Sequence, residues 1–432
     1  MAKRRKPIKV NEAIVKLMDF AIYGKTEFVP IEASYGRIVA ADIIADHPVP
    51  PFDRSPFDGF ALRSADTQSS SSANKISFEV IGEIGAGSTF TEEVGANEAV
   101  RIMTGTAIPA DCDAVIKLES VTEYVQDEKN YFYLKRRLSS GENISFTGED
   151  TQEGTILVSK GTYINPGVVA VLATFGYKDV PVSVKPKVGI IATGSELLDV
   201  GSALEPGKIR NSNAYMVYSQ VLRAGGDPIY FGKLSDEFEP CFNKVKDTVN
   251  KVDFLITTGG VSVGDFDYLP AIYERLGADI LFNKVGMRPG SVTTVAAYEG
   301  KLLFGLSGNP SACYVGFELY ARPLIRTYLQ TKAVFSKKET AVLGADFPKA
   351  NPFDRFVRAN LSYEAGKLVA TPVGFDKSNA VTSLAGANVL IVLPGGTRGY
   401  EKGMDVSVIL LEDQEGASLE AFTAPHVKAK RS

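Results

Sequence analysis

Glycines followed by paired aspartates mark the stretch "LITTGGVSVGDFDY" at residues 255–268. A loop that only reverses the chain does not need both the glycines and the acids. Gly259 and Gly260 would let a ligand approach the backbone closely where an apolar strand ends. Asp265 and Asp267 carry the hard oxygen donors that Mg²⁺ prefers. We therefore expect a site in this loop; the alternative is a capped loop whose acids face water.

Two other loops have a similar composition, "ATGSE" at 192–196 and "LSGNPS" at 306–311. All three follow apolar runs, and in an open α/β sheet ligands bind outside the carboxyl ends of the strands. We therefore expect the three loops to converge. Their candidate ligand-binding residues are Thr193, Gly194, Ser195, Gly259, Gly260, Ser262, Gly264, Ser307, Gly308, Asn309, Pro310 and Ser311.

Backbone amides in these loops would suit an oxyanion, because amides at a helix N-terminus carry partial positive charge. Ser262 and Gly264 would shape a nest of amides. Pro310 after Asn309 predicts a first helical turn that aims the amides around Ser311 outward, with plain helix capping as the alternative. No loop matches G-x-G-x-x-G or G-x-x-x-x-G-K-[ST], which disfavours ordinary dinucleotide and P-loop chemistry.

Charged side chains near the loops extend the pattern. Glu196 and Asp236 follow apparent strand ends, and carboxylates beside phosphate-binding amides would repel one another unless a cation such as Mg²⁺ lay between them. Lys284 and Arg288 flank Gly286, where a guanidinium can bind an oxyanion through two N–H groups. Surface caps and a surface cation pair are the alternatives. The residues alone indicate phosphoryl or other oxyanion chemistry with Mg²⁺.

The composition narrows the class of protein. The 432 residues are 44% hydrophobic and carry a net charge of −4, so there is no broad basic field for nucleic acid. No apolar run reaches the roughly 20 residues that span a bilayer, and no signal-peptide core is present, so we expect a cytoplasmic protein with no membrane partner. Cys112, Cys241 and Cys313 are expected to be buried free thiols. With only His47 and His426, a His/Cys metal site is disfavoured.

The first part of the chain must supply the elements that support this site. Residues 11–22 show the spacing of a helix, with Asn11 as a candidate cap, and would form a packing or oligomer surface. Short apolar runs between 75 and 146 predict a small β domain. Residues 154–164 predict a hairpin, and "NPGVVAVLATFG" predicts a short helix with Pro166 in its first turn.

A different pattern follows in the second half. Near-continuous apolar runs before Gly/Ser/Thr turns fit strands buried on both faces of a parallel sheet, so 185–330 predicts a doubly wound α/β domain. After about residue 335, strands separated by turns predict a small C-terminal β-barrel or sandwich. The expected domains are 1–49 with 147–184, an inserted small β domain at 50–146, an α/β domain at 185–330 and a β-barrel domain at 331–432.

Motifs along almost the whole chain resemble the molybdopterin molybdenumtransferase family, which is also similar to the C-terminal half of gephyrin. They are "PPFDRSPFDGFALR", "GEIGAG", "RIMTGTAIPADCDAVIKLE", "GED", "ATGSELL", "GKIRNSN", "TTGGVSVGDFDY", "MRPG" and "LSGNPSACYVGFEL". The resemblance implies an elongated homodimer of four-domain subunits, in which the first domain dimerises and the α/β domain binds molybdopterin. Its active cleft would lie between this domain and the second domain of the partner subunit, which would supply Asp58 and Thr104.

The family's reaction is Mg²⁺-dependent. Adenylylated molybdopterin and molybdate react, AMP leaves, and molybdenum is bound by the dithiolene sulfurs, so the protein needs no His/Cys cage for it. The implied functional residues are Asp58, Thr104, Asp150, Glu196, Asp236, Asp267, Lys284, Arg288 and Pro310. Glu196 and Asp267 would bind Mg²⁺ or orient the adenylate, and Lys284 and Arg288 would bind molybdate and phosphate.

Several positions depart from the common family pattern. Phe57 and Phe60 stand where Met and Tyr are common, and the second change removes a hydroxyl. Ser307 stands where others have proline. Arg288 and Ser291 stand where lysines are frequent, so one cation is lost at Ser291. These changes keep the charge pattern but alter the details of the molybdate pocket.

Two alternatives remain open at this stage. A non-catalytic pterin-binding carrier or scaffold of the same fold is the first, although a scaffold would not need acids and cations together in the loops. Adenylation of molybdopterin is the second, and it would leave three domains without an evident purpose. The expected partners are a second copy of the chain and small pterin and oxyanion substrates, with other molybdenum cofactor biosynthesis proteins as candidates.

Overall fold

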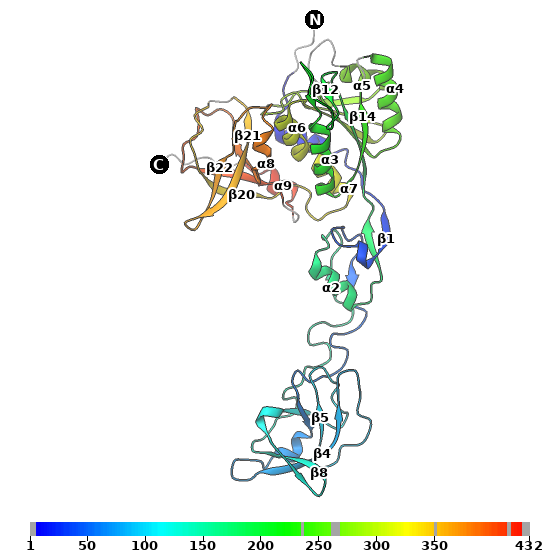
Figure 1. The fold of residues 1–432 in the computed structure, drawn as a ribbon, viewed down its shortest axis with the longest axis vertical. Helices are drawn as coiled ribbons and strands as arrows, with labels where there is room; N and C mark the ends of the chain where they lie inside the picture. Colours follow the sequence, from blue (N-terminus) through cyan, green and yellow to red (C-terminus); the bar gives the residue numbers. More distant parts are fainter. Residues whose placement is uncertain (1–5, 235–236, 261–267, 350–351, 413–415, 426–432) are drawn as a thin grey trace. The chain divides into compact units, whose positions relative to one another are not determined.

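A computed structural model describes residues 6–234, 237–260, 268–349, 352–412 and 416–425 (Figure 1). Asp236 and residues 261–267, which include Ser262, Gly264, Asp265 and Asp267, lie outside this set. Contacts divide the chain into two units. Unit 1 comprises Met1–Ala41, Ser159–Ala173 and Tyr177–Ser432, and unit 2 comprises Asp42–Val158 and Thr174–Gly176.

Unit 2 is built around one sheet. Its strands lie in the order β6 (Ala114–Lys117), β3 (Gly59–Leu62), β5 (Glu98–Ile102), β4 (Ile76–Ile84), β8 (Lys129–Leu134) and β7 (Thr122–Gln126). Phe60, Phe78 and Phe132 are buried and stack on one another, with ring centroids 4.3 and 5.4 Å apart, and so fill the core. Short apolar runs between turns therefore form the small β domain that the sequence predicts.

The hairpin predicted at 154–164 is wrong. β9 (Ile156–Val158) pairs with β2 (Ile43–Ile44), and Tyr163 bridges Ile38. The segment therefore returns along residues more than a hundred positions earlier instead of folding on itself. The short helix is confirmed as α2 (Pro166–Thr174), which begins at Pro166.

The α/β part of unit 1 is a sheet in the order β14 (Asp227–Lys233), β11 (Lys187–Ala192), β15 (Phe254–Thr258), β19 (Lys301–Leu306), β18 (Thr294–Tyr298) and β16 (Asp279–Phe282). β14, β11, β15 and β19 are parallel, and β18 and β16 run antiparallel. All five residues of β15 are buried. Continuous apolar runs therefore mark strands covered on both faces, as expected.

Helices cover both faces of this sheet (Figure 1). One core contains residues of α3 (Asn213–Ala224), α6 (Pro310–Gly316), the π-helical turn η4 (Phe317–Ala321) and α7 (Arg322–Tyr328). The other contains residues of α4 (Phe238–Val249) and α5 (Leu269–Leu276). The domain is therefore doubly wound.

The N-terminal helix is shorter than the sequence predicts. α1 spans Val10–Met18, not 11–22, and Lys9 is its N-cap residue. Asn11 lies inside the helix, where its side-chain amide donates to the Thr423 carbonyl instead of capping. α1 packs into the α/β core through Ile14 and Leu17. After the helix, β1 (Thr26–Pro30) pairs antiparallel with β10 (Asp179–Ser183).

The C-terminal part of unit 1 is a closed barrel. Its strands are β20 (Lys338–Leu343), β21 (Asp354–Glu364), β22 (Lys367–Pro372), β23 (Val389–Leu393) and β24 (Asp405–Leu410). The order β21-β22-β20-β24-β23 closes because β23 also pairs with β21. Short helices α8 (Thr382–Ala385) and α9 (Leu419–Thr423) were not predicted. The multidomain α/β and β fold, with a C-terminal barrel, is confirmed.

The composition also led to expectations about the cysteines and about membrane-spanning segments. Cys112, Cys241 and Cys313 are free and buried, as predicted. Among the residues described, no helix is both long enough and apolar enough to cross a bilayer.

Candidate functional site

The loops after β11, β15 and β19 meet at one edge of the sheet, because these parallel strands are direct neighbours. The Thr193 hydroxyl and amide both donate to the Thr258 carbonyl at 3.0 Å. A Cβ added at Gly259 would lie 2.5 Å from the Thr193 hydroxyl, and one added at Gly308 would lie 3.5 Å from the Gly259 Cα. The described parts of the three loops therefore touch, and the glycines make this possible.

Glu196 provides a carboxylate at this edge. It is exposed, and its side chain folds over Gly194, where an added Cβ would lie 2.6 Å from the Glu196 Oε1. No cation among the described residues pairs with it; the nearby Lys208 donates instead to the Ser195 carbonyl at 2.9 Å. No group of three or more metal-ligating side chains occurs in the described parts of the chain, and the other loop aspartates lie outside them.

The prediction that the amides around Ser311 face outward is wrong. The Ser311 amide donates to the Ser378 carbonyl at 3.0 Å, and its hydroxyl donates to the Ala380 carbonyl. Ser311 is fully buried. Pro310 does begin α6 after Asn309, as expected, but the Asn309 side chain makes no capping bond. The start of the helix therefore docks the barrel segment around Ser378.

A cavity of about 490 Å³ lies between the α/β part and the barrel of unit 1. From the α/β side it is lined by Arg288, Pro289, Gly290, Ser291, Val292, Ser307, Asn309 and Ala312. From the barrel side it is lined by Arg355, Arg358, Asp376, Lys377, Ser378 and Asn379. Among the described residues that line this space, four are cationic and one is a carboxylate, so its charge suits an oxyanion.

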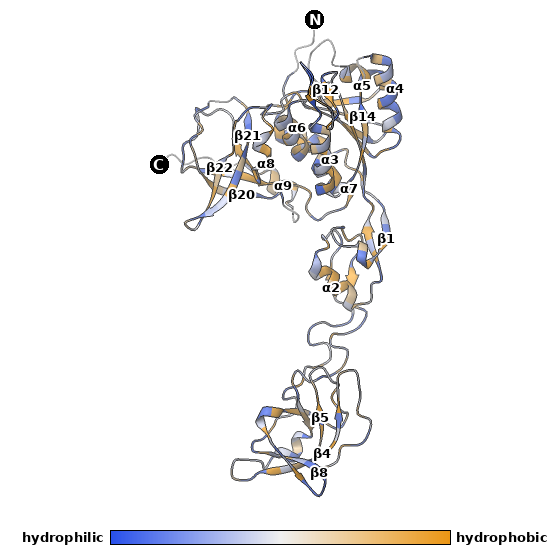
Figure 2. Ribbon diagram, viewed as in Figure 1, coloured by the Kyte–Doolittle hydropathy of each residue, from blue (hydrophilic) through white to orange (hydrophobic). Residues whose placement is uncertain are grey.

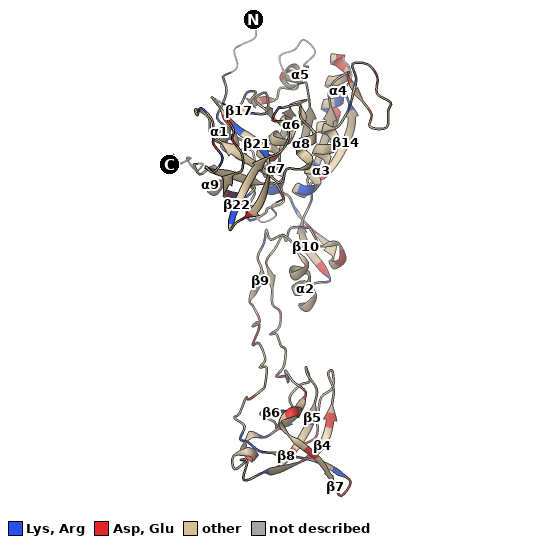
Figure 3. Ribbon diagram, turned by 60° about the vertical axis from the view of Figure 1, so that its left-hand side comes forward, with Lys and Arg blue, Asp and Glu red and all other residues tan. Residues whose placement is uncertain are grey.

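The backbone brings two of these cations together. β17 (Met287–Arg288) lies beside β21 and pairs with it in parallel (Figure 3). Arg288 is the register partner of Arg355 in this pairing. Arg355 donates to the Asp376 carboxylate through Nε at 3.1 Å and through a terminal nitrogen at 2.6 Å. Arg358 is 1% exposed, and its burial lowers the pKa of its guanidinium.

Of the expected site residues, Arg288, Ser307 and Asn309 line this cavity, whereas Lys284 does not. Sequence reasoning missed Arg355, Arg358 and the other lining residues of the barrel. One signal was present: in "RFVRANL" an arginine interrupts an apolar strand, and a buried arginine requires partners.

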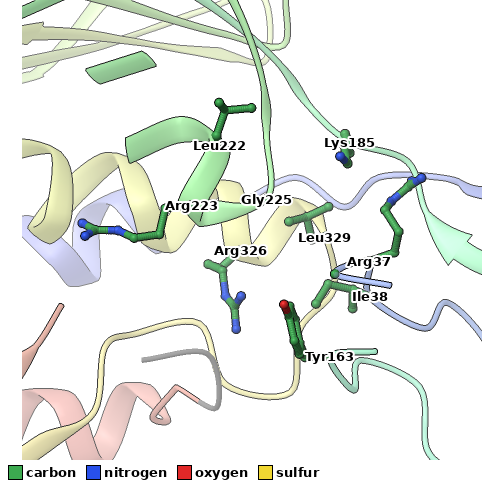
Figure 4. Close-up of a pocket in the computed structure, with 10 residues that line it drawn as sticks. Arg37, Ile38, Tyr163, Lys185, Leu222, Arg223, Gly225, Arg326 and Leu329 are labelled. Carbon is green, nitrogen blue, oxygen red and sulfur yellow. The ribbon is translucent and has the colours of Figure 1, made fainter. Parts of the chain in front are cut away.

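A second, smaller cavity of about 260 Å³ is lined in part by Arg37, Lys185, Arg223, Arg326 and Tyr163 (Figure 4). Arg326 and Tyr163 point toward one another there, whereas Arg37 and Arg223 point away (Figure 4). Arg37 pairs with a carboxylate of β1, and Arg223 pairs with carboxylates of η4 and of the C-terminal segment. Much of its positive charge is thus already matched, which makes it the weaker candidate for an anion site.

Unit 2 carries the other expected residues. The Asp58 carboxylate accepts hydrogen bonds from the Thr104 amide at 2.7 Å and the Thr104 hydroxyl at 2.8 Å. These bonds, the amide first, lower the pKa of Asp58. Asp150 is exposed. Phe60 is fully buried in the core, and the Lys117 ammonium lies 3.7 Å from the centre of the Phe57 ring.

Three regions of the chain match known protein families. Residues 8–176 match the MoeA N-terminal region (domain I and II), 189–327 match a probable molybdopterin binding domain, and 340–411 match the MoeA C-terminal region (domain IV). A molybdopterin molybdenumtransferase of Bacillus subtilis (strain 168) is 59% identical over 96% of this chain and 97% of the relative. The chain belongs to the molybdopterin molybdenumtransferase family.

Another relative and a solved structure support this family assignment. The Staphylococcus aureus (strain COL) protein of that name is 48% identical over 95% of this chain and 97% of its own length. The crystal structure of the molybdopterin biosynthesis moeA protein from Pyrococcus horikoshii OT3 is 32% identical, with a TM-score of 0.80, and covers 94% of this chain and 100% of that one. The resemblance read from the motifs is confirmed, together with the transferase class.

Proposed function

We propose that this protein inserts molybdenum from molybdate into adenylylated molybdopterin, with release of AMP and with Mg²⁺ as cofactor. The observation that carries this proposal is the cationic cavity beside the loops at the sheet edge, where Arg288 and Arg355 are register partners. A tetrahedral dianion such as molybdate needs several N–H donors that are fixed in place and partly shielded from water. The cavity provides donors of this kind.

The loops at the sheet edge would hold the adenylylated pterin. Gly259 contacts both Thr193 and Gly308, so the glycines let the three loops pack closely together, and backbone amides at this edge would bind a phosphate. Ser307 and Asn309 also line the cavity and so connect it to these loops. The pterin and the oxyanion would thus be held in adjoining spaces, which lowers the entropy cost of their reaction. Lys284 would serve as a further cation for phosphate.

Glu196 fits a role toward Mg²⁺, because its carboxylate is exposed and is a hard oxygen donor. It would act with Asp267, while Asp236 would remain a candidate for the same site. Bound Mg²⁺ would withdraw charge from the phosphoanhydride as AMP departs.

We also propose that the protein acts as a homodimer in which Asp58, Thr104 and Asp150 serve the site of the partner subunit. α2 supports this proposal: it is apolar along its length, yet only Leu172 is buried (Figure 2). Tyr215, Tyr218 and Leu222 form an exposed apolar stripe on α3. We expect Leu222→Glu to shift the mass measured by light scattering from dimer to monomer, and the same change at the exposed barrel residue Tyr363 to leave it unchanged. A wild-type protein that is monomeric would contradict the proposal.

The test of the reaction is AMP release from adenylylated molybdopterin by the purified protein with Mg²⁺, measured with and without molybdate. Molybdate-dependent release supports the transferase. Tight pterin binding without release at any molybdate concentration would overturn it and favour a non-catalytic carrier of the same fold.

A further inference from the structure

Asp376, the one carboxylate among the described residues that line the oxyanion cavity, has an unusual position. Asp376 is bonded by Arg355 through two nitrogens, and Lys349 and Arg358 lie 3.6 and 3.9 Å from its carboxylate oxygens. Its side chain is only 15% exposed. Asp376 therefore occupies the place among these cations that an oxyanion of the substrate would take.

Arg358 does not depend on Asp376 for its position. Arg358 donates to the Ser383 hydroxyl at 2.8 Å and to the Phe375 carbonyl at 3.1 Å. Arg355 is held by its strand register beside Arg288, and its guanidinium lies 5.1 Å from the centre of the Phe347 ring. Removal of the carboxylate would leave Arg358 in place, would free the Arg355 guanidinium to bind another acceptor and would leave both charges uncompensated.

We propose that Asp376 is an internal competitor for the oxyanion: its carboxylate holds Arg355 until the oxyanion binds and weakens the binding of molybdate, so that the oxyanion is held reversibly. This inference rests on the proposed function of the cavity. It makes Asp376 a residue that sets affinity rather than one that builds the site. Binding of the oxyanion would require Arg355 to exchange one pair of acceptor oxygens for another, with no change in the number of its hydrogen bonds.

The opposite role is the natural alternative. If Asp376 mainly orients Arg355, its loss would weaken oxyanion binding, as the loss of a positioning residue does in other sites. The two roles thus predict changes of opposite sign in the same dissociation constant.

The test is calorimetric titration of the full-length protein with molybdate and, separately, with sulfate at low ionic strength. We expect Asp376→Asn to bind molybdate about fivefold more tightly than wild type, since one charge about 4 Å away is worth about that factor even in water. The gain should shrink as salt is added, because screening reduces the competition. Glu339→Gln is the matched control: it removes one charge from the same barrel, where the ion pair that Glu339 makes within the described part of the chain is with Lys337 at 3.8 Å, and it should leave the affinity unchanged.

Equal or weaker binding by Asp376→Asn overturns the inference. Circular dichroism checks that each variant is folded; if the Asn variant is not, Asp376→Ala is titrated instead with the same expectation, and Asp376→Glu should behave as wild type. The proposed function is decided separately by AMP release from the wild type. A wild type that binds molybdate without releasing AMP would remove the transferase proposal and leave this inference standing.

Discussion

Arg288 and Arg355 face each other as register partners across the parallel pairing of β17 with β21. The first belongs to a loop of the α/β part and the second to the barrel, so two backbone segments that are far apart in sequence hold two positive charges side by side. Such an arrangement is repulsive unless an anion lies between the charges. Asp376 pairs with Arg355, and the oxyanion of the substrate would supply the counter-charge for Arg288.

Loss of either arginine should weaken oxyanion binding. We expect Arg288→Ala and Arg355→Ala each to raise the dissociation constant for molybdate about 10- to 100-fold, since a hydrogen bond to a charged group is worth about 1.5–3 kcal/mol. Calorimetric titration measures this, and AMP release should fall with it. Lys367→Ala, at an exposed position where β22 of the same barrel begins, is the control. Unchanged affinity in both arginine variants would show that molybdate binds elsewhere.

Gly259 should not tolerate a side chain. Its φ is +92°, and a Cβ would lie 2.5 Å from the Thr193 hydroxyl, so Gly259→Ala combines backbone strain of about 1–3 kcal/mol with a clash. We expect a lower melting temperature and loss of AMP release. Gly277→Ala isolates the strain, because Gly277 also has positive φ but no atom near its added Cβ. If the Gly259→Ala protein were active, the close approach of these loops would not be required for the reaction.

The Asp58–Thr104 pair predicts a measurable titration. Thr104→Val removes the hydroxyl but keeps the amide bond, so the pKa of Asp58 should rise part of the way toward its ordinary value of 3.8. Because the pKa is lowered in the folded protein, the stabilisation is present at neutral pH and is lost as the pH falls below 3.8 through the folded pKa. Carbon-13 NMR titration of the carboxyl signal reports this shift. Thr104→Ser should keep the wild-type pKa, and a Val variant without any rise would contradict the assignment.

A buried ion pair joins α3 to the π-helical turn. Glu318, 1% exposed at its side chain, accepts from Arg223 at 2.5 Å and from the Gln220 amide at 2.6 Å. Glu318→Ala would leave a buried cation without this carboxylate, and we expect a loss of about 3–5 kcal/mol in the free energy of unfolding. Denaturant titration measures it. Glu239→Ala, which removes a surface partner of Arg275, should cost no more than about 1 kcal/mol.

The three thiols should be unreactive in the folded protein. Burial raises the pKa of Cys112 to about 12, and it also raises the pKa of Cys313. We expect no reaction with a disulfide reagent at pH 8 and release of all three thiols in guanidinium chloride. Rapid labelling of Cys313 in the native state would mean that α6 opens readily.

Features of the fold and the site that follow from local sequence patterns were predictable, whereas those that depend on contacts between distant segments were not. The runs before residues 192, 259 and 306 are so uniformly apolar that buried parallel strands, and therefore one shared loop edge, followed from the sequence. Arg355 and Asp376 did not, because only the docking of the barrel brings them to Arg288. The hairpin at 154–164 failed for the same reason, since its partner strand lies at Ile43–Ile44.

The insertion of unit 2 has a consequence for how such chains can change. Ile43 and Val158, near its two ends, are paired residues of β2 and β9. The chain therefore enters and leaves unit 2 at neighbouring positions. Residues can be gained, lost or exchanged within such a unit without a shift in the strand pairing of the rest of the fold. Recombination at these two positions would therefore be a simple route by which relatives acquire a different second domain while they keep the same oxyanion site.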